Sequence, residues 1–365
     1  MKTTLRRYRY PLAVWGLSRI GVYLVVAMQG WVSRRPKGSG ASYGAFLRSL
    51  GDWDANWYRW IAEHGYDPSI GHGNTAAFFP LYPLAWSPLT WLPGRDVLWG
   101  SLLSSALLAV ALCVLYRITL GRYDEGMARR TVLYLAIFPL TFVFSLPYAE
   151  SLFLLLVLAA FALTWYGRWW WGCVVAALAV VTRPVGIALF PALAWRRWRL
   201  GERRVVAYLP LLLLPAAELA FFGFLWWRTG DPLAHFHAQE RGWQRGVSVL
   251  PIVVVKALAD AFGSDHLRYL LHVSFTLLWV GLFVKAWRMR LPGEYLIYAA
   301  LLIILPTSGG LLVSIGRFGM VGFPFFWALA DLGRDERVDT VVRFAFPLLL
   351  GAIVFVTFGP RTFTP

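Results

Sequence analysis

Between its first two long apolar runs, the chain reads GDWDANWYRWIAEHGY over residues 51–66. Two aspartates, Asp52 and Asp54, stand here among large aromatic residues. A loop that only connects two membrane helices needs neither feature. A surface that holds a lipid and moves a proton on it needs both, because indole rings settle at the membrane interface and carboxylates accept protons. The stretch therefore indicates chemistry at the face of a helical membrane protein.

The composition supports a membrane protein. The chain has 365 residues, of which 58% are hydrophobic and 15% charged, and its mean hydropathy is +0.57, a profile typical of a polytopic membrane protein. We interpret the net charge of +16 as cytoplasmic anchoring beside anionic lipids, in preference to nucleic-acid binding. Cys113 and Cys173 both lie in apolar segments, which predicts core packing and neither a disulfide framework nor a metal cluster.

The apolar runs predict an all-α, polytopic bundle with about eleven transmembrane segments in a single domain, residues 1–365. Several runs are short, which predicts tilted, broken or paired half-helices. Residues 78–93 are apolar but carry four prolines, so they predict a membrane-dipping loop or the bent start of the next helix. The runs are 11–28, 97–116, 131–147, 151–166, 169–182, 184–195, 205–227, 267–287, 295–306, 318–332 and 341–358.

Basic residues orient this bundle. With the N-terminal Arg6, Arg7 and Arg9 in the cytoplasm, alternation of the crossings brings every other arginine-rich loop to the same side, as the positive-inside rule requires. The acids, histidines and tryptophans then gather in extracytoplasmic loops, chiefly 29–96 and 228–265. Any chemistry is therefore expected on the extracytoplasmic face. The inside loops hold Arg117, Arg122, Arg129 and Arg130; Arg196, Arg197, Arg199, Arg203 and Arg204; Arg288 and Arg290; Arg334 and Arg337.

Within the first outer loop, the spacing predicts a short amphipathic helix. Trp53, Trp57, Trp60 and Ile61 recur at i, i+4, i+7 and i+8, and such a stripe anchors at the level of the lipid head groups. Asp54 stands about 100° around the helix from Trp53, at the edge of the stripe, where its carboxylate faces a head group.

Other acids of this region have competing interpretations. Asp52 is either the N-cap of the helix or a second catalytic group, and Glu63 points away from Asp54 and is structural. The Asp-Trp-Asp triplet resembles a metal-binding pattern, but three residues leave the metal open. Glu150, in the segment Pro147–Ser151, either caps the next helix or binds sugar hydroxyls.

Two arginines interrupt apolar segments on the outer side. Placing the charged side chain of Arg183 or Arg317 within an apolar membrane segment would cost several kcal/mol of free energy unless the charge is paired or hydrated. Each one either extends to the membrane surface or meets a phosphate or an acid, the natural partners of a guanidinium.

The second outer loop holds His235 and His237. Their i, i+2 spacing with no evident third ligand is a weak metal signal. No nucleotide-binding or serine-hydrolase motif is present in the sequence, which disfavours nucleotide-driven transport.

The order of these motifs resembles the PIG-V-type mannosyltransferases, the glycosylphosphatidylinositol mannosyltransferase II family and its bacterial homologues. The likeness extends from about Arg19 to Phe326. It is carried by Trp53-Asp54 with Ile61–Tyr66, Phe78-Phe79-Pro80-Leu81-Tyr82-Pro83, Pro147–Phe153, Arg183-Pro184-Val185-Gly186, and Arg317-Phe318 before Phe323-Pro324.

That resemblance implies a GT-C glycosyltransferase fold. Such enzymes transfer a sugar, usually mannose, from a polyprenyl-phosphate donor to a lipid-linked or glycan hydroxyl on the outer face, typically with inversion. It implies Asp54 as general base and Arg183 and Arg317 on the donor phosphate. The bias for arginine over lysine indicates a GC-rich bacterial genome, hence a bacterial plasma membrane, with the endoplasmic reticulum as the eukaryotic equivalent.

We accordingly expect three groups of site residues. No metal ligand is assigned, no cofactor is required, and a divalent metal is left open. The expected partners are the polyprenyl-phosphate sugar, a lipid or glycan acceptor and membrane lipids, without nucleic acid. The groups are Asp54 and Asp52 for catalysis; Arg183, Arg317, Glu150 and Tyr148 for the donor; and Trp57, His64, Tyr82, His235, His237 and Gln239 for the acceptor.

Two alternatives remain. A sugar-lipid flippase or transporter would use the same aromatic loop and buried arginines, but would also need a polar path to the cytoplasmic face. A noncatalytic scaffold would keep its function after the loss of one carboxylate.

Overall fold

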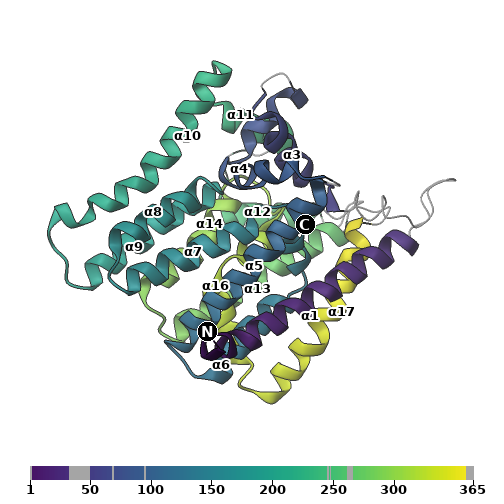
Figure 1. Ribbon diagram of the computed structural model, residues 1–365, viewed down its shortest axis with the longest axis vertical. Coiled ribbons are helices and arrows are strands. Elements are labelled where there is room, and N and C mark those ends of the chain that lie inside the picture. The colour runs from purple at the N-terminus through teal and green to yellow at the C-terminus, as the bar shows by residue number, and fades with distance from the viewer. Residues whose placement is uncertain are drawn as a thin grey trace.

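The computed structural model describes residues 2–32, 50–67, 70–93, 96–244, 246, 248–260 and 266–358. These residues form helices joined by turns, and no strand occurs among them (Figure 1). The predicted all-α class is confirmed. The α-helices are α1 Lys2–Val32, α3 Asp54–His64, α4 Leu81–Trp86, α5 Asp96–Leu120, α6 Glu125–Ile137, α7 Glu150–Trp165, α8 Trp169–Val180, α9 Leu189–Arg199, α10 Leu213–Thr229, α11 Ala234–Trp243, α12 Leu250–Asp260, α13 His266–Arg288, α14 Gly293–Thr307, α15 Ile315–Met320, α16 Phe323–Leu332 and α17 Glu336–Phe358; the 3₁₀ helices are η1 Ile70–Ala77, η2 Ser87–Trp91, η3 Thr141–Ser145, η4 Pro184–Ala188 and η5 Val205–Leu212.

The described part of the chain contains 5 helical segments long and apolar enough to cross a bilayer, which makes this a multi-pass membrane protein. Further apolar helices are shorter than a bilayer is thick. The long segments are Tyr8–Gln29, Val97–Leu120, Val205–Thr229, Tyr269–Arg288 and Glu336–Phe358; the shorter ones are Glu150–Trp165, Trp169–Val180, Leu250–Ala259, Gly293–Thr307 and Phe323–Leu332.

The short helices meet end to end at breaks in the backbone. α15 and α16 are separated at Val321 and Gly322, and α8 is separated from η4 and α9 at Arg183. At the second break, η4 packs closely against the end of α8. Only glycine fits at position 186, because a Cβ there would lie 2.7 Å from the carbonyl oxygen of Ala179 and would clash with it. These breaks bear out the expectation of half-helices for the short runs.

Both predicted outer loops contain helices in their described parts. Loop 29–96 holds the expected amphipathic helix α3, followed by η1, α4 and η2, and loop 228–265 holds α11 and α12. Residues 78–93, expected as a dipping loop or the bent start of a crossing, form the separate helices α4 and η2 packed on α5. Residues 33–49, 68–69, 94–95, 245, 247 and 261–265 of these loops lie outside the described part.

The molecule has two chemically different ends. At one end, which we call the basic end, the arginine-rich loops meet: Arg334 lies 2.9 Å from Asp124, and Lys285 lies 2.7 Å from Asp331. The N-terminal half of α1 reaches the same end, where Tyr10 donates a hydrogen bond to the Arg129 carbonyl. In Figure 1, the N-terminus and α6 mark the basic end, and α3, α4 and α11 mark the opposite one. We call that opposite end the site end.

Candidate functional site

Helix α3 brings Asp54 to the site end as its first residue. Trp53, just before it, occupies the N-cap position with a φ of 55°, and its side chain forms no capping hydrogen bond. The N-cap interpretation of Asp52 is therefore wrong. The backbone carbonyl of Asp52 accepts a 3.4 Å hydrogen bond from the Tyr148 hydroxyl. Asp52 therefore contacts one of the residues expected to bind the sugar donor.

The predicted stripe on α3 is only partly turned toward the protein: Ile61 is buried, whereas Trp53, Trp57 and Trp60 are partly exposed, and the buried face also includes Tyr58, which lies outside the stripe. Trp57 stacks on Phe78 with ring centroids 6.1 Å apart, and Tyr58 is buried between Phe78 and Tyr82. Packing of these rings fixes the rotation of α3, so Asp54 is held in one direction.

That direction is toward Arg317. The Asp54 Oδ2 accepts a 2.7 Å hydrogen bond from Arg317 Nη1, across 263 residues of sequence. The guanidinium also donates to Ser314 Oγ at 3.0 Å and lies 5.2 Å from the centre of the Tyr148 ring. Burial lowers the pKa of Arg317, but Asp54 and Glu150 raise it by more, so its net pKa is above the ordinary value. The charged form of this buried arginine is therefore stabilised.

Glu150 joins the two arginines into one cluster. It is 1% exposed, forms an ion pair with Arg183 Nη1, and lies 3.5 Å from Arg317 Nη1. The Arg183 guanidinium also lies 4.7 Å above the Phe318 ring. Ala149, not Glu150, precedes α7 as its N-cap, and no side chain caps that helix, so the capping interpretation of Glu150 is wrong. Asp54, Glu150, Arg183 and Arg317 form what we call the charge cluster.

The charge cluster borders a cavity of about 80 Å³. Asp54, Arg183 and Arg317 line it, and Glu150 supports the two arginines from behind. Arg317 Nε and Glu150 Oε2 are buried without a hydrogen-bond partner in the described part of the chain. Buried polar atoms without partners cost roughly 1–3 kcal/mol each, so a ligand that pairs with them gains that energy back.

Some residues expected at the acceptor are near the cavity. Gln239, on α11, lines it and donates to the Ala77 carbonyl at 3.2 Å. Trp57 packs against Phe78, which is itself part of the lining.

Other residues expected at the acceptor do not line the cavity. Tyr82 is fully buried, and its hydroxyl bonds to Ser104 and Gly100, so it belongs to the core. His64 is half-exposed at the far end of α3 and stacks on Trp60.

The two histidines of α11 have structural partners. His235 is buried and bonds to the Ala76 carbonyl at 3.0 Å, tying α11 to η1. His237 contacts Asp231 Oδ2 at 2.7 Å, and that hydrogen bond lowers the pKa of Asp231. The expectation that Tyr82, His64, His235 and His237 contact an acceptor is therefore not supported by their positions. Among the described residues, no group of three or more His, Cys, Asp or Glu side chains is placed to hold a metal ion.

Several site residues were missed in the sequence. Tyr58, Ser314 and Trp243 line the cavity. Tyr58 stands four residues after Asp54, and Ser314 three residues before Arg317, so helical spacing could have found both. Burial is the largest cause of the raised pKa of Tyr58, so its hydroxyl stays neutral.

Arg19 in α1 was also missed, although it lies within the apolar run 11–28 and so carries the same signal as Arg183 and Arg317. It is buried and donates to the Thr141 carbonyl and to Ser145 Oγ, both at 2.8 Å, and to the Ala136 carbonyl at 3.1 Å. These bonds fix η3, the segment that leads into Glu150.

The fold and the site define a multi-pass helical membrane protein with a buried cluster of two carboxylates and two guanidinium groups beside a cavity. No family model matches the chain, and no curated protein matches it. Among solved structures, it is similar to the oligosaccharyltransferase of Archaeoglobus fulgidus, in a complex with Zn and sulfate, at 14% sequence identity and a TM-score of 0.44. That match covers 92% of this chain and 53% of the other, so the chain spans about half the length of that protein.

Proposed function

We propose that the protein is a membrane glycosyltransferase of the GT-C type. It would transfer a mannosyl or other hexosyl unit from a polyprenyl-phosphate sugar to a hydroxyl of a lipid-linked or glycan acceptor. The observation that carries this proposal is the charge cluster, in which three segments far apart in sequence bring a carboxylate and two arginines to one cavity.

The arginines suit the leaving group. When the sugar departs, its phosphodiester becomes a phosphate monoester and gains negative charge. Arg183 and Arg317 both line the cavity, and Arg317 Nε has no hydrogen-bond partner among the described residues. Guanidinium groups bind phosphate oxygens through paired N–H donors, so the two arginines would stabilise the charge as it develops.

Asp54 suits the role of base. The acceptor oxygen would attack the anomeric carbon while the bond from that carbon to the phosphate oxygen breaks. The bonding electrons leave with the phosphate, and the hydroxyl proton passes to the Asp54 carboxylate. A single displacement of this kind inverts the anomeric centre. The hydrogen bond from Arg317 to Asp54 Oδ2 would orient the carboxylate for this step.

Glu150 would be a positioning residue. It contacts both arginines and does not line the cavity, so it sets their spacing without touching substrate. Tyr148, under the Arg317 guanidinium, restricts the same side chain.

The positive-inside rule gives the orientation. The basic end would face the cytoplasm and the site end the outside of a bacterial plasma membrane. The donor and acceptor would then both be reached from the outer leaflet, and their hydrocarbon tails would remain in the bilayer.

The test is a transfer assay on the purified protein in phosphatidylcholine vesicles. A radiolabelled polyprenyl-phosphate mannose is supplied with a bacterial lipid extract as the source of acceptor. We expect label in a new product, with equimolar release of polyprenyl phosphate, and loss of both in Asp54→Asn. Movement of labelled donor between leaflets without any product would instead identify a flippase.

A further inference from the structure

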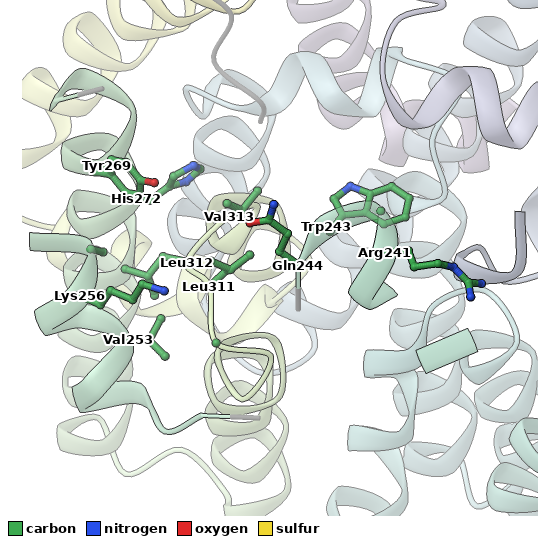
Figure 2. A pocket seen from close by; sticks show the side chains of 13 residues that line it. Arg241, Trp243, Gln244, Val253, Lys256, Tyr269, His272, Leu311, Leu312 and Val313 are labelled. Carbon is green, nitrogen blue, oxygen red and sulfur yellow. The ribbon is translucent and has the colours of Figure 1, made fainter. Parts of the chain in front are cut away.

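A second cavity lies next to the charge cluster. Its volume is about 320 Å³, within the range of small-molecule sites, and it lies between α11, α12, α13 and the segment Gly310–Val313 (Figure 2). Trp243 lines both cavities, and Val313 of the second precedes Ser314 of the first. The two cavities therefore share the Trp243 side chain and are lined by consecutive residues of the same chain segment.

Its described lining is basic. Lys256 on α12 extends toward Leu311 and Leu312 in Figure 2, and Arg241 stands at the opposite rim, beyond Trp243. No described lining residue carries a carboxylate. Outside the lining, Arg241 lies close enough to Asp231 to contribute to the lowered pKa of that carboxyl, so Lys256 is the cation of the cavity that carries the argument. In the charge cluster, by contrast, each arginine contacts an acid.

Polar donors accompany these cations. Tyr269 and His272 face the cavity from α13, on the same side as Lys256, and Gln244 enters from the end of α11. Positive charge together with hydroxyl, imidazole and amide groups matches the oxygen atoms of a phosphate and its attached alcohol.

One wall of the cavity is suited to a lipid. Val253 and Ala257 of α12 are buried toward the cavity, whereas Ile252, Val255 and Leu258 are exposed on the outer side of the same helix. An apolar outer side in a membrane protein faces hydrocarbon chains. The cavity therefore adjoins the bilayer at a position where a head group can enter while its chains stay outside.

We propose that this second cavity binds the phosphate-bearing head group of a membrane lipid, and that this anionic lipid is the sugar acceptor. Binding of the head group follows from the charge and position of the cavity. Naming the lipid as acceptor rests on the proposed function, because the shared Trp243 would place the head-group hydroxyls beside Asp54.

Binding can be measured without transfer. The full-length protein in phosphatidylcholine nanodiscs is titrated with dihexanoyl phosphatidylglycerol, with dihexanoyl phosphatidylcholine and with inorganic phosphate. We expect the anionic lipid to bind about tenfold more tightly than either comparator, and Lys256→Gln to remove most of that preference. Arg241→Gln, at the rim, should have a smaller effect. Arg337→Gln at the basic end removes the same charge from an exposed position and should change nothing.

Equal binding of the two lipids, an unchanged preference in Lys256→Gln, or phosphate binding as tight as the lipid would each overturn the proposal. Asp54→Asn separates it from the proposed function: this variant should still bind the anionic lipid. If lipid binding depends on Lys256 but no sugar is transferred by any preparation, head-group binding stands and the acceptor role fails with the proposed function. If transfer occurs equally well to uncharged lipids, the acceptor role alone is wrong.

Discussion

Two buried glutamates, one at each end of the molecule, are each held by two arginines. At the basic end, Glu294 is 0% exposed and receives hydrogen bonds on both carboxylate oxygens, from Arg196 at 3.0 Å and from Arg199 at 2.7 and 3.1 Å. At the site end, Glu150 is equally buried, but Oε2 has no hydrogen-bond partner among the described residues.

The difference between the two sites lies in their surroundings. The arginines around Glu294 join the end of α9 to the start of α14, so its satisfied carboxylate holds two helices together. Those around Glu150 line a cavity, and one of them, Arg317, also pairs with a second acid, Asp54. The same residue types therefore make a structural joint when both carboxylate oxygens are hydrogen-bonded, as in Glu294, and a candidate binding site when a carboxylate oxygen is left without a hydrogen bond beside a cavity, as in Glu150.

The largest expected effect is on transfer. Asp54→Asn keeps the shape of the side chain but cannot take a proton, so transfer should fall by about 10²–10⁴-fold. Donor binding should survive, because a negative charge beside the phosphate is removed. Rates are measured on purified protein of equal thermal stability. Asp52→Asn is the matched control and should be much milder; near-normal transfer by the Asp54 variant would move the base elsewhere.

At the basic end, the effect should be on stability. Glu294→Gln leaves the buried Arg196 without its acid, and breaking a buried ion pair costs roughly 3–5 kcal/mol. The midpoint of thermal unfolding should drop clearly, while transfer per folded molecule stays normal. A drop in transfer at unchanged stability would mean that the two ends are coupled in function and would remove the contrast between the clusters.

Arginine-to-lysine substitutions compare the clusters at constant charge. Arg183→Lys and Arg317→Lys keep a cation beside Glu150 but lose the paired donors, so donor affinity should fall by about tenfold. Alanine at either position should weaken donor binding further, and donor binding more than acceptor binding. Arg199→Lys should leave donor affinity unchanged. Equal donor affinity in all three lysine variants would exclude the two arginines of the charge cluster from phosphate binding.

Single cysteines locate the two ends without disturbing either cluster. Ser308→Cys, exposed at the site end, should react with a membrane-impermeant thiol reagent in intact cells, whereas Arg337→Cys at the basic end should not. The parent chain, with Cys113 and Cys173 alone, gives the background. Transfer should be unchanged in both variants. The reverse labelling pattern would invert the topology and place the cavity in the cytoplasm.

The sequence was sufficient to predict much of the charge cluster. Asp54 could be selected by its place beside the tryptophan stripe, and Arg183 and Arg317 by the cost of a charge within an apolar run. Such signals are local, so they can be read along the chain. The sequence did not show that Arg317 contacts Asp54, because those residues are 263 positions apart and meet only when the start of α3 lies against α15 in the folded chain.

The same limit explains why other residues have partners that their type did not suggest. Tyr82 and His235 have residue types that bind sugars, yet packing places the tyrosine in the core and bonds the histidine to the Ala76 carbonyl. Asp52 has the residue type of an N-cap, but the chain turns at Trp53 and the helix begins one residue later than capping by Asp52 requires. A side chain's chemistry follows from its type, whereas its partner follows from the packing around it.

By itself, the sequence determined that this is a helical membrane protein, that its basic loops share one end, and that a few costly charges interrupt its apolar runs. These properties depend on composition and on spacing along the chain, which the transfer of side chains between water and lipid controls directly. Only the tertiary structure decided which charges meet, which buried glutamate has hydrogen bonds on both carboxylate oxygens, and where the two cavities lie. Those outcomes depend on contacts between segments remote in sequence, which come together only when the helices pack.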